Sequence, residues 1–233
     1  MPPRPSSPRW SSSSSAFFLF ALAFVLSAST SNSYSISRRG SFTKALPVLL
    51  SPLPTFAFDN TLPRDKYKDR PKRKGPQPSD LGVAYRGLKG CGPGANCFST
   101  TGDPELDSYY MIKDIFTPPP STSSPLSDVV SVISTYEVGH DNIDSGGFKI
   151  ITEKQDYVYA QFESLKNGYI DDVEFAILNG EVLVRSSSRL GYLDYGVNAK
   201  RLNWIGERLK NKGWKVQTID RTTNRDYFEQ NNL

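Results

Sequence analysis

Charged and polar side chains that could do chemistry gather between residues 172 and 201. The candidate site residues are Asp172, Glu174, Arg185, Ser187, Arg189, Tyr192, Asp194, Asn198 and Arg201. Guanidinium groups pair with carboxylate or phosphate oxygens, and the start of a helix also attracts anions. One hypothesis is that Arg185, Arg189 and the following helix start form an anion pocket for a carboxylate, a phosphate or a peptide terminus. The other is an ion pair and a capping loop that only support the fold.

A catalytic arrangement is harder to assemble from these residues. Asp171 points to the opposite face of its strand from Asp172, and an arginine opposite Glu174 would keep that carboxylate ionised. The single histidine, His140, falls in a predicted loop, so the serines at 186–188 have no obvious base. The sequence has no glycine-rich phosphate loop or metal-ligand cluster, and we expect neither a cofactor nor a metal. A hydrolase remains the enzymatic alternative.

The two cysteines, Cys91 and Cys97, lie close together in the segment CGPGANC. Zinc sites need more cysteine or histidine ligands than this sequence offers. The glycines and proline at 92–94 let the chain double back, so a local structural disulfide is plausible in an oxidising compartment. Two free thiols or a redox-regulated pair remain alternatives, although the spacing differs from the Cys-x-x-Cys of oxidoreductases.

Four runs rich in β-branched and aromatic residues predict strands at 147–152, 157–163, 169–178 and 181–187. The Asn-Gly pair at 179–180 predicts a two-residue hairpin turn between the last two runs. That turn sets the register, so Glu174 faces Arg185 and Asp172 faces Ser187. One face of the hairpin is therefore core, and the other is partly polar and uncovered.

Two amphipathic helices accompany these strands, one over 124–136 and one over 199–212 with Asn198 as its cap. The residues from 214 to 219 could add a short strand. Together the elements predict an α+β domain, a four-stranded antiparallel β-meander with two helices packed on one face.

The first 57 residues have the composition of a targeting leader. They contain five basic residues and no acidic ones, and they include a 12-residue apolar run at 16–27. A second apolar run follows the arginine pair at 38–39, as in a twin-arginine signal. Stacked signals of this kind resemble the leader of a thylakoid-lumen protein of a secondary plastid. A primary-plastid transit peptide and a plain secreted protein are the alternatives.

Residues 58–80 read as a basic, proline-rich linker ahead of a single domain over 81–233. The stretch from 64 to 78 has seven basic and two acidic residues, which predicts an extended or disordered segment that buries nothing. Residues 64–74 could instead contact anionic lipid headgroups or an acidic partner. Because the excess of basic residues comes mostly from the leader, we expect no nucleic-acid partner.

Three segments carry a family resemblance: CGPGANCFS, YIDDVEF and VLVRSSSRLGYLDYGVNAKRL. In this order and spacing they resemble the family known as domain of unknown function 1499, over about residues 85–216. The resemblance implies a compact domain with no assigned reaction and supplies no catalytic residues. Photosynthetic members of the family look like plastid proteins.

These observations predict a non-enzymatic binding or assembly module for photosynthetic complexes in the thylakoid lumen. Its expected partner is a protein in or at the thylakoid membrane. The alternative is a hydrolase or a thiol-redox protein that acts through Cys91 and Cys97.

Overall fold

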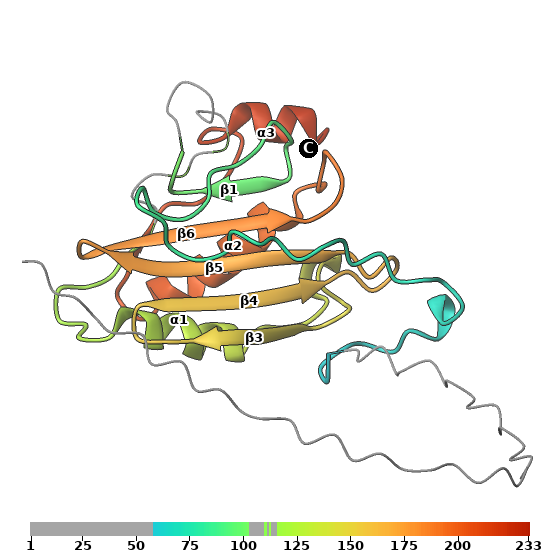
Figure 1. Ribbon diagram of the computed structural model, residues 1–233, viewed down its shortest axis with the longest axis horizontal. Coiled ribbons are helices and arrows are strands. Elements are labelled where there is room, and N and C mark those ends of the chain that lie inside the picture. Colours follow the sequence, from blue (N-terminus) through green and yellow to red (C-terminus); the bar gives the residue numbers. More distant parts are fainter. Residues whose placement is uncertain (1–57, 103–109, 111, 113–115) are drawn as a thin grey trace, which may run out of the picture. The chain divides into compact units, whose positions relative to one another are not determined.

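An antiparallel sheet organises the part of the chain that the structure describes, residues 58–102, 110, 112 and 116–233 of a computed structural model (Figure 1). The described elements are η1 (Asp65–Tyr67), β1 (Cys97–Ser99), β2 (Phe116–Thr117), α1 (Pro125–Ser134), η2 (His140–Asn142), β3 (Phe148–Glu153), β4 (Tyr157–Glu163), β5 (Ile170–Leu178), β6 (Glu181–Ser188), α2 (Val197–Lys210), β7 (Lys215–Val216) and α3 (Arg225–Gln230). The strand order of the main sheet is β1-β6-β5-β4-β3, and β2 pairs separately with β7. The α+β class is confirmed, but the sheet has five strands where four were predicted. The extra strand, β1, is too short to show a sequence pattern.

The chain divides into two units, Met1–Pro52 and Leu53–Leu233. The buried hydrophobic residues of the described core all belong to the second unit. The predicted targeting leader, residues 1–57, lies outside the described residues. None of the helices in the described ranges is long and apolar enough to span a bilayer.

The hairpin of β5 and β6 forms as the sequence predicts. Asn179 and Gly180 have φ angles of 53° and 83°, the positive values that a tight two-residue turn requires. The register pairs Glu174 with Arg185 across the two strands. This register sends alternate side chains to opposite faces of the sheet, which decides where each candidate residue lies.

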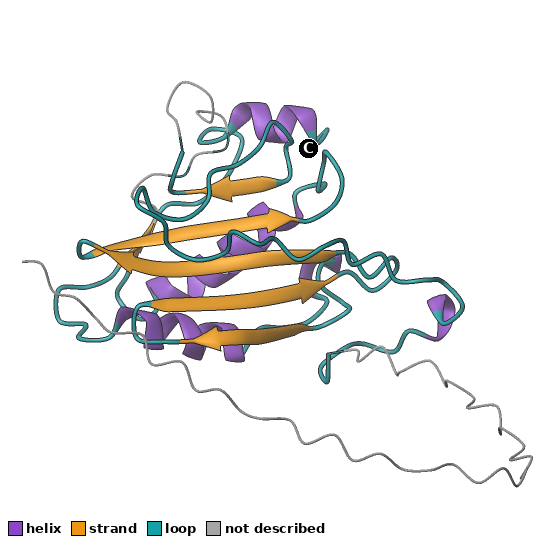
Figure 2. Ribbon diagram, viewed as in Figure 1, coloured by secondary structure: helices purple, strands orange, loops and turns teal. Residues whose placement is uncertain are grey.

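Helices α1 and α2 cover one face of the sheet (Figure 2). The core between the layers is apolar, and its fully buried residues include Leu126, Ile133, Phe162, Phe175, Leu202 and Ile205. A third helix, α3, adds Tyr227, whose ring centroid lies 4.4 Å from that of Phe98 next to the edge of the sheet. Two helices were predicted, and α3 was missed because it has only six residues.

Helix α2 begins at Val197, two residues before the predicted start. Asn198 is therefore inside the helix and is not its cap. The N-cap residue is Gly196, so the predicted cap is wrong. The carboxylate of Asp194, two positions earlier, accepts hydrogen bonds of 3.0 Å from the backbone N–H groups of Gly196 and Asn198.

The opposite face of the sheet is covered by the chain that precedes β1. Figure 1 shows this segment running across β5 and β6. The backbone N–H of Gly82 donates to Glu174 at 2.7 Å, and Lys72 forms an ion pair with the fully buried Glu163. The prediction that this face is uncovered is therefore wrong. The prediction that residues 64–78 bury nothing is also wrong, because Lys72 covers the carboxylate of Glu163. The segment is held by polar contacts with the sheet, which its low apolar content did not reveal.

Candidate binding site

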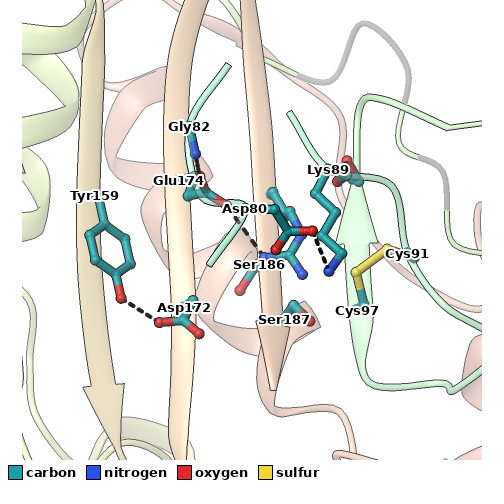
Figure 3. A network of polar contacts seen from close by, with 12 residues as sticks. Asp80, Gly82, Lys89, Cys91, Cys97, Tyr159, Asp172, Glu174, Ser186 and Ser187 are labelled. Atoms are coloured by element: carbon teal, nitrogen blue, oxygen red, sulfur yellow. Dashed lines mark hydrogen bonds and ion pairs between the residues drawn. A yellow bond between two sulfur atoms is a disulfide. The ribbon is translucent and has the colours of Figure 1, made fainter. Parts of the chain in front are cut away.

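The predicted site residues of β5 and β6 lie on the polar face of the sheet, under the covering segment. Glu174 accepts hydrogen bonds from Gly82 N–H at 2.7 Å and from the Tyr157 hydroxyl at 2.8 Å. Arg185 Nη1 lies 3.3 Å from the other oxygen of the same carboxylate. Glu174 and Arg185 are both buried. Figure 3 shows Glu174 between Gly82 and the neighbouring strand. Arg185 is thus held by its ion pair with Glu174.

Arg189 forms a second ion pair on this face, with Asp172. Its Nε and Nη2 atoms each lie 2.8 Å from one carboxylate oxygen, a bidentate arrangement. The Tyr159 hydroxyl also donates to Asp172, at 2.6 Å. Burial, with this hydrogen bond, raises the pKa of Tyr159 to about 12. The carboxylate of Asp172 therefore accepts hydrogen bonds from both Arg189 and Tyr159.

Ser187 lies on the same face and pairs with Cys97 of β1. Cys91 and Cys97 form a disulfide, as predicted, with an S–S distance of 2.10 Å (Figure 3). The bridge closes the loop that leads into β1 and joins it to the edge of the sheet.

Arg201 lies on the other face, completely buried between α2 and the sheet. Its guanidinium binds Asp144 through Nε at 2.8 Å and Asp171 through Nη2 at 2.7 Å. Asn198 accepts a further bond of 2.8 Å from Nη1. Burial raises the pKa of Asp171, and the charge of Asp144 acts in the same direction against that of Arg201. The prediction that Asp171 faces away from Asp172 is confirmed.

Asp144 belongs to this cluster, and sequence reasoning missed it. It lies in the loop between α1 and β3, 57 residues before Arg201. The available signal was weak: an isolated aspartate in the stretch NIDSGG, with a φ angle of 52° in the structure. Such a residue reads as an ordinary turn aspartate.

Asp194 joins the loop after β6 to helices α2 and α3. Besides binding backbone N–H groups at the start of α2, its carboxylate accepts hydrogen bonds from the Tyr227 hydroxyl at 2.6 Å and from Asn198 Nδ2 at 2.7 Å. Arg185 and Arg189 therefore lie on one face of the sheet, and Asp194, Asn198 and Arg201 on the other. The structure does not bring the predicted anion pocket together as one site.

A pocket of about 900 Å³ opens instead at one end of the sheet. Its lining comes from four separate segments, within residues 67–73, 142–145, 164–171 and 188–197. We call it the tyrosine pocket, after the lining residues Tyr67, Tyr169, Tyr192 and Tyr195. Asp144, Asp171 and Asp194 also reach its lining. Of the predicted site residues, the pocket thus includes Tyr192 and Asp194.

The loop from 190 to 195 gives the pocket an exposed aromatic wall. Tyr192 is 58% exposed and Tyr195 is 68% exposed, and Leu190 is also exposed. Tyr195 has a φ angle of 57°, which is rare for a bulky residue. Large apolar side chains left in solvent beside a cavity are typical of a recognition surface.

The disulfide loop supports this wall from behind. Asn96 Nδ2 donates to the Gly191 carbonyl at 2.7 Å, and Ala95 forms an isolated bridge with Leu193. A side chain at Gly94 would place a Cβ atom 2.9 Å from the Tyr192 carbonyl oxygen, so only glycine fits there. The Cys91–Cys97 bridge and the aromatic wall are therefore parts of one packed unit.

No cluster of three or more potential metal ligands occurs among the residues that the structure describes. The fold and the site together define an α+β domain with an antiparallel sheet, two buried polar networks and a pocket at the end of the strands. Its sequence matches the profile of a protein family of unknown function, DUF1499, over residues 87–209, and the chain belongs to that family. Comparisons with curated proteins and with solved structures each found no significant match.

Proposed function

We propose that this protein is a non-enzymatic binding module, and that the tyrosine pocket is its binding site. The observation that carries the proposal is the contrast between the pocket and the two networks. In the networks, Arg185, Arg189 and Arg201 are buried or nearly so and bound to carboxylates. At the pocket, the rings of Tyr192 and Tyr195 are exposed, and their hydroxyls form no hydrogen bond with the described residues. A binding site for another molecule is expected to leave such groups without partners inside the fold, as this pocket does.

The proposed place of action is the thylakoid lumen, where the module would serve the assembly or upkeep of photosynthetic complexes. The support for this part comes from the composition of residues 1–57 and from the plastid character that the family resemblance implies. The disulfide is compatible with an oxidising compartment. The proposed partner is a component at the thylakoid membrane, where the sequence predicts a protein partner.

Affinity purification from solubilised algal thylakoids tests the proposal. The bait is the tagged unit 53–233, compared with a Tyr192→Ala/Tyr195→Ala variant. Because both rings are largely exposed, the variant should keep its free energy of unfolding within about 0.5 kcal/mol of the wild type. We expect recovery of the partner to fall at least tenfold, since aromatic anchors dominate recognition.

Tyr85→Ala is the matched control, because Tyr85 is 100% exposed and does not line the pocket. It should recover the partner like the wild type. Equal recovery by all three baits would show that the tyrosine pocket is not the binding site.

An enzymatic role is the second candidate, and one observation favours it. Asp171 lines the pocket and burial raises its pKa, as a general acid requires. However, Asp171 also binds Arg201 at 2.7 Å, which a structural role explains equally well. Turnover of an ester, phosphoester or peptide by the unit 53–233, lost in Asp171→Asn, would establish the hydrolase. A thiol-redox role would require Cys91 and Cys97 to cycle between disulfide and thiols.

A further inference from the structure

The mouth of the tyrosine pocket combines basic and aromatic walls. Arg73 and Lys166 line it from two segments that are bonded together, since Arg73 N–H donates to the Asn167 carbonyl at 2.7 Å. Arg64 strengthens the same junction, because its Nε donates to the Leu165 carbonyl at 2.8 Å. The exposed ring of Tyr192 comes from a third lining segment, the loop after β6.

Most basic side chains at this end of the molecule form no ion pair, whereas the buried basic side chains do. Lys72, Arg185, Arg189 and Arg201 each form an ion pair with a buried carboxylate. Within the described residues, no ion pair is formed by the following basic side chains: Lys66, Lys68, Arg70, Arg73, Lys74 and Lys166. Unpaired cations in this number attract an anion.

The carboxylates of the pocket do not cancel these charges. Asp144 and Asp171 already bind Arg201, and Asp194 accepts hydrogen bonds from Tyr227 and Asn198. The three aspartates still repel an anionic group deep in the pocket, so the negative charge of an occupant should lie at the mouth. The aliphatic part of the lining comes from Ile143, Leu165, Leu190, Leu193 and Val197, and neutral polar groups come from Asn142, Ser145, Ser164, Asn167 and Ser188.

The volume of the pocket limits further which kind of molecule it can hold. About 900 Å³ lies near the upper end of the range for small-ligand sites, which is roughly 300–1,000 Å³. Such a volume accommodates a headgroup with part of an apolar chain. A bare phosphate would leave the aromatic and aliphatic lining without contact.

We propose that the tyrosine pocket binds an anionic amphiphile, with its oxyanion at Arg73 and Lys166 and its apolar part against Tyr192 and the aliphatic lining. This inference rests on the proposed function, because it names the chemistry of the occupant of the same site. The amphiphile can come from a bilayer lipid or from a free molecule, and both present this chemistry. An acidic protein segment is the competing occupant.

Calorimetric titration of the unit 53–233 with monomeric short-chain lipids tests the chemistry. Dihexanoyl-phosphatidylglycerol is the anionic probe, and dihexanoyl-phosphatidylcholine is the zwitterionic probe of equal chain length. Two Lys/Arg contacts at a membrane surface correspond to about thirtyfold in affinity, so the anionic lipid should bind about thirtyfold more tightly. Inorganic phosphate should bind far more weakly than the anionic lipid.

Two matched double variants assign the effect to the mouth of the pocket. Arg73→Ala/Lys166→Ala should reduce the affinity for the anionic lipid to that for the zwitterionic one. Arg221→Ala/Lys215→Ala also removes one arginine and one lysine, both exposed and neither lining the pocket, and should change nothing. Vesicle flotation with and without long-chain phosphatidylglycerol then separates the two sources. Binding of the protein to these vesicles identifies a bilayer lipid, whereas binding of the short-chain monomers alone identifies a free amphiphile.

Equal affinity for the two lipids, no effect of Arg73→Ala/Lys166→Ala, or no binding of either lipid would overturn the inference. The proposed function has a separate readout in the thylakoid purification with the tyrosine variant. Loss of a protein partner in that variant, without lipid selectivity, would keep the binding site and replace the amphiphile with a protein segment. Unchanged affinity of the tyrosine variant for both lipids would also contradict the proposed position of the apolar part.

Discussion

At the scale of single residues, burial separates the side chains that hold the fold from those that can meet a partner. Arg201 is completely buried and binds Asp144, Asp171 and Asn198. A charge buried in this way is tolerated only because each polar group around it is satisfied. Arginines rank high among candidate ligand-binding residues, yet Arg185, Arg189 and Arg201 are held in ion pairs within the fold. Their chemistry alone could not distinguish the two roles.

The hydroxyl of Tyr159 yields a prediction about pH. Its pKa is about 12 in the folded protein against a reference value of 10.0, so the folded state retains this proton more tightly than the unfolded state. The resulting stability is fully present below pH 10 and is lost as the pH rises through 12. Tyr159→Phe should lower the free energy of unfolding by about 2 kcal/mol at neutral pH, since it removes a hydrogen bond to a charged group.

Urea unfolding at a series of pH values checks this prediction. The difference between wild type and Tyr159→Phe should shrink above pH 10, where the wild type begins to lose the contribution of this proton. Tyr85→Phe serves as the control and should follow the wild type throughout, because its hydroxyl is exposed. A difference that stays constant through this pH range would show that the Tyr159 proton is not held by the fold.

At the scale of elements, the sequence predicted what depends on local pattern. Strands β3 to β6 and the hairpin register follow from β-branched runs and from the turn at 179–180, and all are observed. Strand β1 and helix α3 are too short to show a period. The covering of the polar face by residues before β1 depends on contacts such as Gly82 to Glu174, which span 92 positions. The tyrosine pocket could not be predicted, because its four walls come from separate parts of the chain.

The disulfide loop leads to a prediction about how β1 is coupled to the end of β6. In Cys91→Ser/Cys97→Ser, the free energy of unfolding should fall by about 2 kcal/mol, the chain-entropy cost of so short a loop. The backbone N–H of Ser188, bonded to the Asn96 carbonyl at 3.0 Å, should exchange with solvent faster in this variant. Hydrogen exchange with amide resolution is the measurement.

Amides shared between β4 and β5 provide the internal reference, because that pairing is remote from the bridge in the strand order. Their exchange should change only by the global loss of stability. If the Ser188 amide behaves like this reference, the disulfide does not support the aromatic wall.

At the scale of the whole molecule, the charge is unevenly placed along the chain. Residues 75–233 contain 16 basic and 21 acidic residues, whereas residues 64–74 contain seven basic and two acidic ones. The structure holds the basic segment beside the loop at 164–168, so its free cations gather at the end where the pocket opens. The two faces of the sheet hold the fold together, and this end carries the pocket that we propose as the binding site.

One comparison tests this division of roles most directly: Arg189→Ala beside Tyr192→Ala, each measured for thermal unfolding and for recovery of partner from thylakoids. Arg189→Ala leaves the buried carboxylate of Asp172 without its cation, so we predict a loss of about 3 kcal/mol in stability. Tyr192→Ala should unfold like the wild type and lose the partner. If Arg189→Ala instead unfolds like the wild type and loses the partner, while Tyr192→Ala retains it, the binding site lies at the arginines and the account is wrong.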